Sequence, residues 1–149
     1  PLFMGCYGLG VSRLVAALVE VHHQGDSIRW PVAVAPCTAA VLSLGGGDLL
    51  SAEQVAAHAQ GVFGAQEVIL DDRLDISPAV RLRDAELLGF PFVLIVSPRN
   101  DQKGVVEVRT RWPDAQCRLI PKLELPSALL SLWQDAGTHG PAGAQPMQW

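Results

Sequence analysis

The chain has 149 residues, which bounds it to one domain, with or without an appendage, and allows a sizeable core. Apolar residues make up 49% of it, which excludes an intrinsically disordered chain, and its apolar runs stay below the roughly 18 residues of a membrane-spanning helix. Three cysteines without a C-x-x-C pair predict neither a disulfide framework nor a zinc site, and a formal net charge of −4 does not by itself favour a nucleic-acid partner.

The first predicted element is a glycine-rich turn followed by a helix. Gly8 and Gly10 remove side chains at two nearby points, which lets the backbone approach a ligand closely. Apolar residues at helical spacing then predict a helix over residues 11–23. Arg13 lies in its first turn, where a cation opposes the helix dipole unless an anion is bound nearby. This segment alone therefore leaves open both a phosphate-contacting arginine and a surface arginine.

The rest of the chain alternates between apolar runs and helix-period segments, separated by glycine, proline and short polar turns. The predicted elements are an extended linker at 30–37, a strand at 38–44, a helix at 51–63, a strand at 67–70, a helix at 77–89, strands at 92–96, 105–111 and 117–120, and a closing helix at 123–134. Ser51 followed by Gln54 resembles a capping box, which predicts a helix start at Ser51. The glycine-, proline- and alanine-rich end, 137–149, predicts disorder.

Strands that alternate with helices predict an α/β layer architecture with an at least partly parallel sheet. The wholly apolar run 92–96 indicates a strand buried on both faces, and the alternating run 105–111 indicates a half-exposed strand. A short polar turn joins the two, so we expect them to form an antiparallel hairpin. The pattern alone leaves flavodoxin-like and thioredoxin-like folds open.

Positive charge is concentrated in the middle of the chain. Residues 73–122 contain nine Lys or Arg against six Asp or Glu, whereas residues 1–72 contain two against seven. Nucleic-acid affinity depends chiefly on neutralising phosphates, so any RNA contact is expected within 73–122. The alternative favoured by the isolated sequence is that the arginines of this region form merely solvated faces; these are Arg81, Arg83, Arg109 and Arg111.

Ordered landmarks along the chain resemble a known family. The run Met4–Leu18 is similar to motif 3 of class II aminoacyl-tRNA synthetases, in the form found in prolyl-tRNA synthetases of bacterial type. The similarity continues in the family's order through Trp30-Pro31, Ala35-Pro36, Asp71-Asp72-Arg73, residues 84–91 and residues 104–109, and covers about Leu2 to Ala136. It implies the end of a catalytic domain (1–29), a linker (30–37), an anticodon-binding domain (38–136) with a mixed five-stranded sheet flanked by helices, and a disordered tail (137–149).

The resemblance implies roles for the N-terminal segment. Arg13 matches the motif 3 arginine that pairs with the ATP γ-phosphate, and Gly8 and Gly10 would line the adenosine side. ATP and Mg²⁺ are therefore the cofactors expected of a parent proline–tRNA ligase. Motifs 1 and 2 and the proline pocket would lie upstream, so this chain alone is expected to be non-catalytic, to bind no cofactor and, with Asp71 and Asp72 in a structural loop, to hold no metal.

The resemblance also implies residues that read the UGG anticodon of a proline tRNA. Glu86 matches the acidic position of the Glu-Leu-x-Gly-x-Pro stretch and is expected at the middle base, because a carboxylate accepts hydrogen bonds from N1–H and N2–H₂ of guanine. Arg99 and Asn100 match a basic-plus-polar pair and are expected at the third base, where guanidinium donates to O6 and N7; Asn100 replaces the family's commoner charged partner. Further candidates for tRNA contact are Arg73, Arg109 and Arg111.

Three classes of function remain open. The first is anticodon recognition within a proline–tRNA ligase, with the anticodon stem-loop and the parent catalytic domain as partners. The second is a non-enzymatic protein-interaction module with the same fold, as in polymerase accessory subunits, although the presence of Arg13, Glu86 and Arg99 favours the ligase. The third, a small nucleotide-binding enzyme, lacks a glycine loop between a strand and a helix of the same domain.

The parent protein is expected to be a homodimer with no membrane association. Nine Arg against two Lys and an Ala- and Leu-rich composition fit a GC-rich gene. Short bacterial-type prolyl enzymes also serve mitochondria. A mitochondrial matrix location is therefore expected, with a bacterial cytoplasm as the alternative.

Overall fold

The computed structural model describes residues 1–5, 7–45, 49–111 and 114–138. Its elements, in chain order, are α1 (Val11–His22), η1 (Val32–Val34), β1 (Ala39–Ser43), α2 (Leu49–Phe63), η2 (Ala65–Glu67), β2 (Val68–Asp71), α3 (Pro78–Leu88), β3 (Phe92–Val96), α4 (Pro98–Asp101), β4 (Val105–Thr110), β5 (Gln116–Pro121), η3 (Lys122–Glu124) and α5 (Leu125–Thr138). Among these residues no helix combines the length and apolar character needed to cross a membrane.

The five strands form one mixed sheet in the order β2-β1-β3-β4-β5. β1 runs parallel to β2 and β3, whereas β4 is antiparallel to both β3 and β5. The predicted mixed five-stranded sheet and the β3–β4 hairpin are confirmed. The antiparallel half excludes the wholly parallel sheet of a flavodoxin-like fold.

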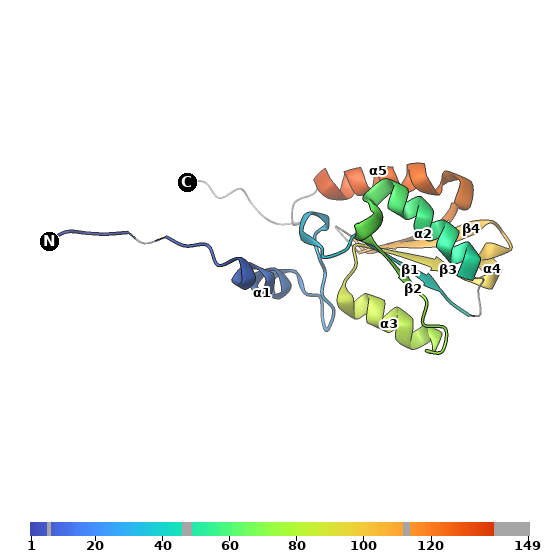
Figure 1. The fold of residues 1–149 in the computed structure, drawn as a ribbon, viewed down its shortest axis with the longest axis horizontal. Helices are drawn as coiled ribbons and strands as arrows, with labels where there is room; N and C mark the ends of the chain where they lie inside the picture. Colours follow the sequence, from blue (N-terminus) through green and yellow to red (C-terminus); the bar gives the residue numbers. More distant parts are fainter. Residues whose placement is uncertain (6, 46–48, 112–113, 139–149) are drawn as a thin grey trace.

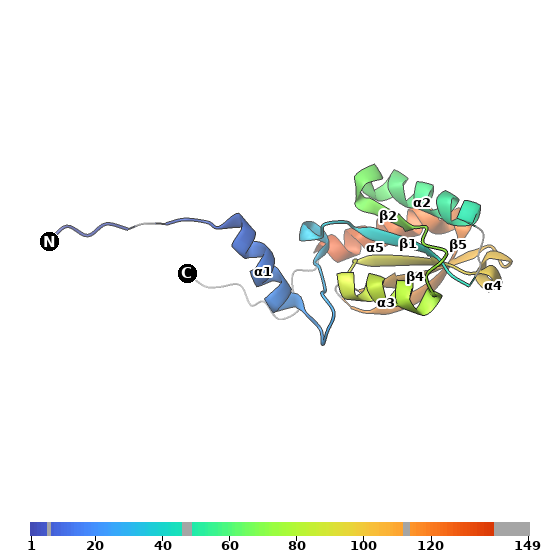
Figure 2. The ribbon, with the colours of Figure 1, turned by 60° about the horizontal axis from the view of Figure 1, so that its bottom comes forward.

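Helices cover the two faces of the sheet unequally. α2 and α5 lie on one face and α3 on the other (Figures 1 and 2). The larger core lies under α2 and α5, and the smaller one joins α3 to β1 and β3 through residues such as Ala85, Val93 and Ile95. β4 alternates buried and half-buried side chains, so Val106 and Val108 enter the larger core while Glu107 and Arg109 face the α3 side.

The β4–β5 half of the α3 face is open. β5 is exposed along nearly its whole length, and Leu119, which pairs with Glu107, is 60% exposed. Because β3 is buried on both faces, as predicted, the open surface begins at β4. The candidate site lies at this boundary.

α3 is held mainly by polar contacts. Of its eleven residues only Ala85 and Arg81 are buried. Arg81 is 2% exposed and donates from Nη1 to the Ser43 carbonyl (2.7 Å) and from Nη2 to the Asp71 carbonyl, at the ends of β1 and β2. The prediction of a solvated Arg81 was therefore wrong, because the side chain turns inward and donates to carbonyls at the ends of two strands.

The other end of α3 is bound to the segment that follows α1. The backbone N–H groups of Ile28 and Trp30 donate to the carbonyls of Leu87 and Gly89. The predicted boundary between residues 29 and 30 falls inside this bonded segment. The predicted linker 30–37 is also less extended than expected, since it contains the single turn of η1.

Two predicted element boundaries differ from the structure. α2 begins at Leu49, so Ser51 lies inside the helix rather than capping it; the hydroxyl is buried and donates to Asp101 (2.6 Å). α5 continues through Gly137 to Thr138, two residues into the predicted tail. The remainder of that predicted disordered segment, 139–149, lies outside the described residues.

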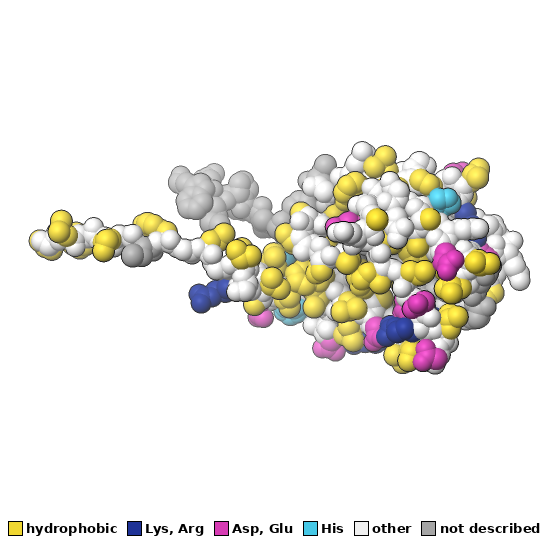
Figure 3. Space-filling view, in the orientation of Figure 1, with side chains coloured by type: hydrophobic (Ala, Val, Ile, Leu, Met, Phe, Trp, Pro, Cys, Tyr) yellow, Lys and Arg dark blue, Asp and Glu magenta, His cyan; other side chains and the backbone are white. Residues whose placement is uncertain are grey.

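The N-terminal segment stands apart from the sheet. Residues 1–5 and 7–10 have no regular structure, and none of the residues of α1 is buried. Large apolar side chains along it are exposed (Figure 3); they include Leu2, Phe3, Met4, Tyr7 and Leu9. The assignment of this segment to a catalytic domain stays a prediction.

Candidate nucleic-acid interface

Glu86 and Arg109 meet at the edge of the open surface. Glu86 comes from the last turns of α3, and Arg109 comes from β4 opposite Val93 of β3. Arg109 Nη1 lies 3.6 Å from Glu86 Oε1, and the two side chains are 36% and 37% exposed. This separation is longer than a hydrogen bond, so the carboxylate can accept hydrogen bonds from a ligand.

A second carboxylate orients the Arg109 side chain. Arg109 Nε donates to Glu107 Oε1 at 2.7 Å, from the same side of β4 two residues away. This bond sets the direction of the guanidinium and directs Nη1 towards Glu86. Donor and acceptor groups therefore lie side by side at the surface.

These two residues line a groove of about 490 Å³ between α3 and the β4–β5 hairpin. Its walls are Leu82, Glu86, Val93, Arg109, Thr110, Arg111, Ala115, Gln116 and Cys117. The buried Val93 gives the floor an apolar character. An apolar floor with a few convergent polar groups is typical of a small-ligand or base-binding site.

Arg111 supports the same groove from below. Its Nη1 donates to the Glu86 backbone carbonyl at 2.6 Å. Burial lowers the pKa of Arg111, and the nearby positive charges of Arg29 and Arg83 lower it further, whereas the Glu86 charge raises it. Arg29 and Arg83 therefore lie close enough to Arg111 to act on it electrostatically.

The groove holds a cysteine that is unsuited to nucleophilic catalysis. Burial, followed by the charge of Glu107, raises the pKa of Cys117 above its usual value. The thiol is therefore protonated at neutral pH, and the thiolate is the reactive form.

The structure does not bring Arg99 and Asn100 to this groove. Both lie on the single turn of α4, which follows the carboxyl end of β3, while Glu86 precedes the amino end of β3 (Figure 1). A strand of five residues spans roughly 17 Å. The two groups of predicted base-reading residues therefore occupy opposite ends of one strand.

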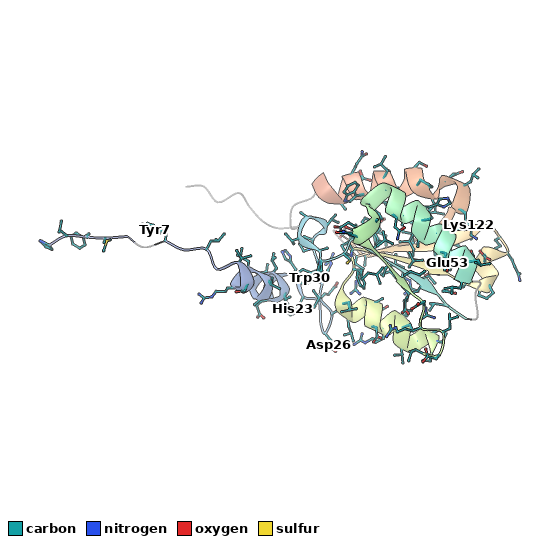
Figure 4. All side chains as sticks on the ribbon, viewed as in Figure 1. Tyr7, His23, Asp26, Trp30, Glu53 and Lys122 are labelled. Atoms are coloured by element: carbon teal, nitrogen blue, oxygen red, sulfur yellow. The ribbon has the colours of Figure 1, made fainter. Side chains whose placement is uncertain are left out.

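Polar contacts fix the α4 turn. Asp101 Oδ1 accepts hydrogen bonds from Ser51 Oγ and from Lys122 Nζ, which itself lies 2.6 Å from Ser51 Oγ. The hydrogen bond from Lys122, followed by that from Ser51, lowers the pKa of Asp101. Figure 4 shows Lys122 towards the α4 end of the domain and Trp30 towards the opposite end.

Arg73 lies at a third position. It pairs with Asp71 (2.9 Å) and Asp84 (3.0 Å) beside a groove of about 510 Å³ between β2 and α3. Asp71 Oδ1 also accepts the backbone N–H of Arg73, which caps the loop after β2. Arg73 is thus already paired with two carboxylates within the domain.

The residues predicted to contact ATP do not form a nucleotide site by themselves. Gly10 precedes α1, Arg13 is exposed in its first turn, and a Cβ added to Gly8 would meet no neighbour within 4 Å. No enclosing wall surrounds them in the described part of the chain. Within the same residues no group of three or more His, Cys, Asp or Glu could hold a metal ion.

A family model described as "Anticodon binding domain" matches residues 32–132, more than half of the chain. The chain belongs to the anticodon-binding domain family. The matched range contains all five strands and the Glu86–Arg109 groove.

Curated relatives of this anticodon-binding domain are named proline–tRNA ligases. The chain is 39% identical over 110 residues to the probable mitochondrial enzyme of Schizosaccharomyces pombe, an alignment covering 74% of this chain and 26% of that protein. It is 38% identical over 137 residues to the Magnetococcus marinus enzyme (90% and 23%) and 46% identical over 114 residues to the Desulfotalea psychrophila enzyme (74% and 20%). The predicted resemblance to prolyl-tRNA synthetases is confirmed, and the chain spans about a quarter or less of these relatives' length.

A solved structure has the same fold. The prolyl-tRNA synthetase of Cryptosporidium parvum, in a crystal structure with halofuginone and AMPPNP, matches with a TM-score of 0.73 at 20% sequence identity. The match covers 85% of this chain and 26% of that chain. At this identity the likeness shows the fold alone.

Sequence reasoning missed several residues that shape the groove of this anticodon-binding domain. Glu107, which orients Arg109, was not singled out, although its position two residues away in an alternating strand places both on one face. Trp30 is buried, and its indole Nε1 donates to the Leu88 carbonyl (3.0 Å), a partner that the sequence does not indicate. No local signal in the sequence predicts that contact, because 58 residues separate the partners.

Proposed function

We propose that this chain recognises the anticodon of a proline tRNA as the anticodon-binding domain of a proline–tRNA ligase. The observation that carries the proposal is the juxtaposition of the Glu86 carboxylate and the Arg109 guanidinium above Val93, at the boundary of the open sheet surface. The family and the names of the curated relatives support the same assignment.

The pair is complementary to the Watson–Crick edge of one guanine. Glu86 would accept hydrogen bonds from N1–H and N2–H₂, while Arg109 would donate to O6. Adenine would present the N1 acceptor to the carboxylate and the N6 amino group to the guanidinium, so both contacts would be repulsive. The apolar floor at Val93 would contact the base face. We assign this groove to the middle base of UGG.

Arg99 and Asn100 are proposed to contact the third base. A span of roughly 17 Å along β3 far exceeds the roughly 3.4 Å rise between stacked nucleotides. The two guanines must therefore be unstacked and splayed apart, which is the usual state of bases that proteins read in RNA loops. Arg73 and Arg111 are proposed to face the tRNA backbone.

The activity of the whole ligase belongs to the same proposal. ATP and Mg²⁺ would be cofactors of the complete enzyme, in which Arg13, Gly8 and Gly10 would meet ATP together with other segments, and this chain alone would not catalyse. A homodimeric parent is proposed. A mitochondrial matrix location is proposed from the arginine-rich composition and the mitochondrial relative, with a bacterial cytoplasm as the alternative supported by the bacterial relatives.

The proposal is tested by measuring binding of the chain to a UGG anticodon stem-loop and to hairpins in which each guanine is replaced in turn, at fixed low salt. Each good base contact contributes roughly 1–3 kcal/mol, so about five- to 150-fold discrimination is expected at each guanine. Equal binding to all hairpins with a steep salt slope would reduce the function to electrostatic RNA binding. Absence of binding would contradict the proposal and favour the protein-interaction module.

A further inference from the structure

The carbonyls at the carboxyl end of α3 are capped by donors from distant parts of the chain. A helix leaves its last four carbonyls without intrahelical partners. In α3 the Ala85 carbonyl accepts the Gly89 N–H, and the next carbonyls accept as follows: Glu86 from Arg111 Nη1, Leu87 from the Ile28 N–H, Leu88 from Trp30 Nε1 and Gly89 from the Trp30 N–H.

Residues 27–30 supply most of these donors and are built into the domain. A tight turn with paired Gln24 and Ser27 backbone bonds follows α1, and Ser27 and Trp30 are buried. Arg29 Nε donates to the Arg111 carbonyl (2.6 Å), which joins this segment to the end of β4 as well. The chain from Arg29 through Arg111 to the Glu86 carbonyl is continuous.

Apolar packing at this helix end is limited. Ala85 is buried and Leu82 is partly buried against the same core, while Leu87 and Leu88 are 36% and 56% exposed. The Arg81 contacts hold the opposite end of the helix. Without the cap, the last turn that carries Glu86 would have little to hold it over the groove.

Gly89 makes the close approach possible. It adopts φ +76°, and a Cβ at this position would collide with the Ile28 carbonyl. A left-handed glycine that ends a helix is common, but here it also provides the space in which residues 28–30 lie against the helix end.

We propose that residues 27–30 form an integral cap of α3 and that Trp30 is a positioning residue for base recognition by Glu86. This inference rests on the proposed function of the Glu86–Arg109 groove. Trp30 itself touches no base; it acts by holding the turn that carries Glu86. The segment that connects α1 to the sheet is thereby part of the anticodon site.

The test measures how well the chain distinguishes guanine from inosine at the middle anticodon position. Inosine lacks the N2 amino group, so the ratio of the two dissociation constants reports the Glu86 contact specifically. Trp30→Phe removes the indole N–H and keeps an aromatic ring. We expect the guanine-to-inosine ratio of this variant to be roughly three- to tenfold lower than that of the wild type, the equivalent of about one hydrogen bond. Discrimination at the third base should stay unchanged.

Trp133→Phe is the matched control, because Trp133 lies on α5 at the opposite face, with its ring against Phe63. It should leave both ratios unchanged. Gly89→Ala, in which the added Cβ would displace Ile28, is the second variant and should lower the same ratio. Thermal melting of each variant establishes that it is folded at the binding temperature.

Three outcomes are distinguishable. If Trp30→Phe lowers discrimination between guanine and inosine at the middle base and keeps discrimination at the third base, Trp30 is a positioning residue. A lower melting temperature with an unchanged ratio overturns the inference and leaves Trp30 a purely structural residue. A wild-type chain without any guanine-to-inosine discrimination overturns the proposed function of the groove, and the inference with it.

Discussion

Arg81 and Asp71 form an ion pair inside the domain, with Arg81 Nε 3.1 Å from Asp71 Oδ1. Arg81 is 2% exposed and Asp71 12% exposed in their side chains. Among the described residues, Arg81 Nε has no hydrogen-bond partner of acceptable geometry, so the contact is electrostatic. The pair joins the start of α3 to the end of β2.

Replacing Arg81 by Met should destabilise the domain by about 3 kcal/mol, because it leaves Asp71 without its buried partner and two carbonyls without their donor. The urea dependence of unfolding measures this change. Arg83→Met is the matched control two residues away: Arg83 is half exposed and lies 3.8 Å from an exposed Asp26, so its loss should change the unfolding free energy by less than about 0.5 kcal/mol. Equal effects would contradict the assignment.

Asp71 should make stability depend on acid pH. Burial opposes its ionisation, but the hydrogen bonds from Arg73 and the charge of the buried Arg81 outweigh burial and lower its pKa from 3.8 to about 2. A depressed folded-state pKa contributes stability that is complete above the unfolded value near 4 and is lost as the pH falls towards 2. The stability gap between the wild type and Asp71→Asn should narrow by about 2 kcal/mol between pH 5 and pH 2. A gap independent of pH would contradict this.

Two glycine substitutions should act in opposite directions. Gly89→Ala places a side chain at φ +76° and against the Ile28 carbonyl, and it should destabilise the domain by more than about 1 kcal/mol. Gly61 lies inside α2 with no atom within 4 Å of an added Cβ, so Gly61→Ala should stabilise by about 0.5–1 kcal/mol. Calorimetric melting of both variants checks the pair of signs.

Glu86→Gln should reduce discrimination at the middle guanine by about five- to 150-fold, since the amide NH₂ group would face the N–H donors of the base. Affinity for hairpins without that guanine should stay level or rise, because a negative charge is lost. Glu53→Gln, at an exposed position of α2, is the charge-matched control and should alter neither ratio. Fluorescence titration with labelled hairpins gives these ratios.

Arg99→Ala should reduce discrimination at the third guanine alone, because α4 lies at the far end of β3 from Glu86. Lys103→Ala, just beyond the same turn, removes a charge without a proposed base contact, so it should weaken all hairpins equally. If Arg99→Ala instead affects the middle base, the two ends of β3 do not read separate nucleotides.

The helices and strands could be predicted from local residue patterns, but their boundaries were predicted less accurately. Apolar alternation predicted β4, and a wholly apolar run predicted β3, because burial of one or two faces leaves a direct trace in the residue order. The start of α2 was misplaced because Ser51 has the residue type of a cap but is used to bind Asp101, 50 residues away.

The candidate site could likewise be predicted only in part. The residue types Glu86 and Arg109 could be singled out from the chain, but their 3.6 Å approach depends on how α3 crosses the sheet and on the β3–β4 register. Arg99 belongs to the same predicted set and lies at the other end of β3.

The α/β class, the order of the elements and the family could be inferred from the residue order, because periodicity, turn residues and ordered motifs are properties of neighbouring residues. The buried arginines, the carbonyls that Trp30 and Arg111 cap, and the base-reading candidates that meet are set by packing in three dimensions. These contacts join residues 10 to 58 positions apart, and their geometry depends on packing and strand register, which no local window of the sequence contains.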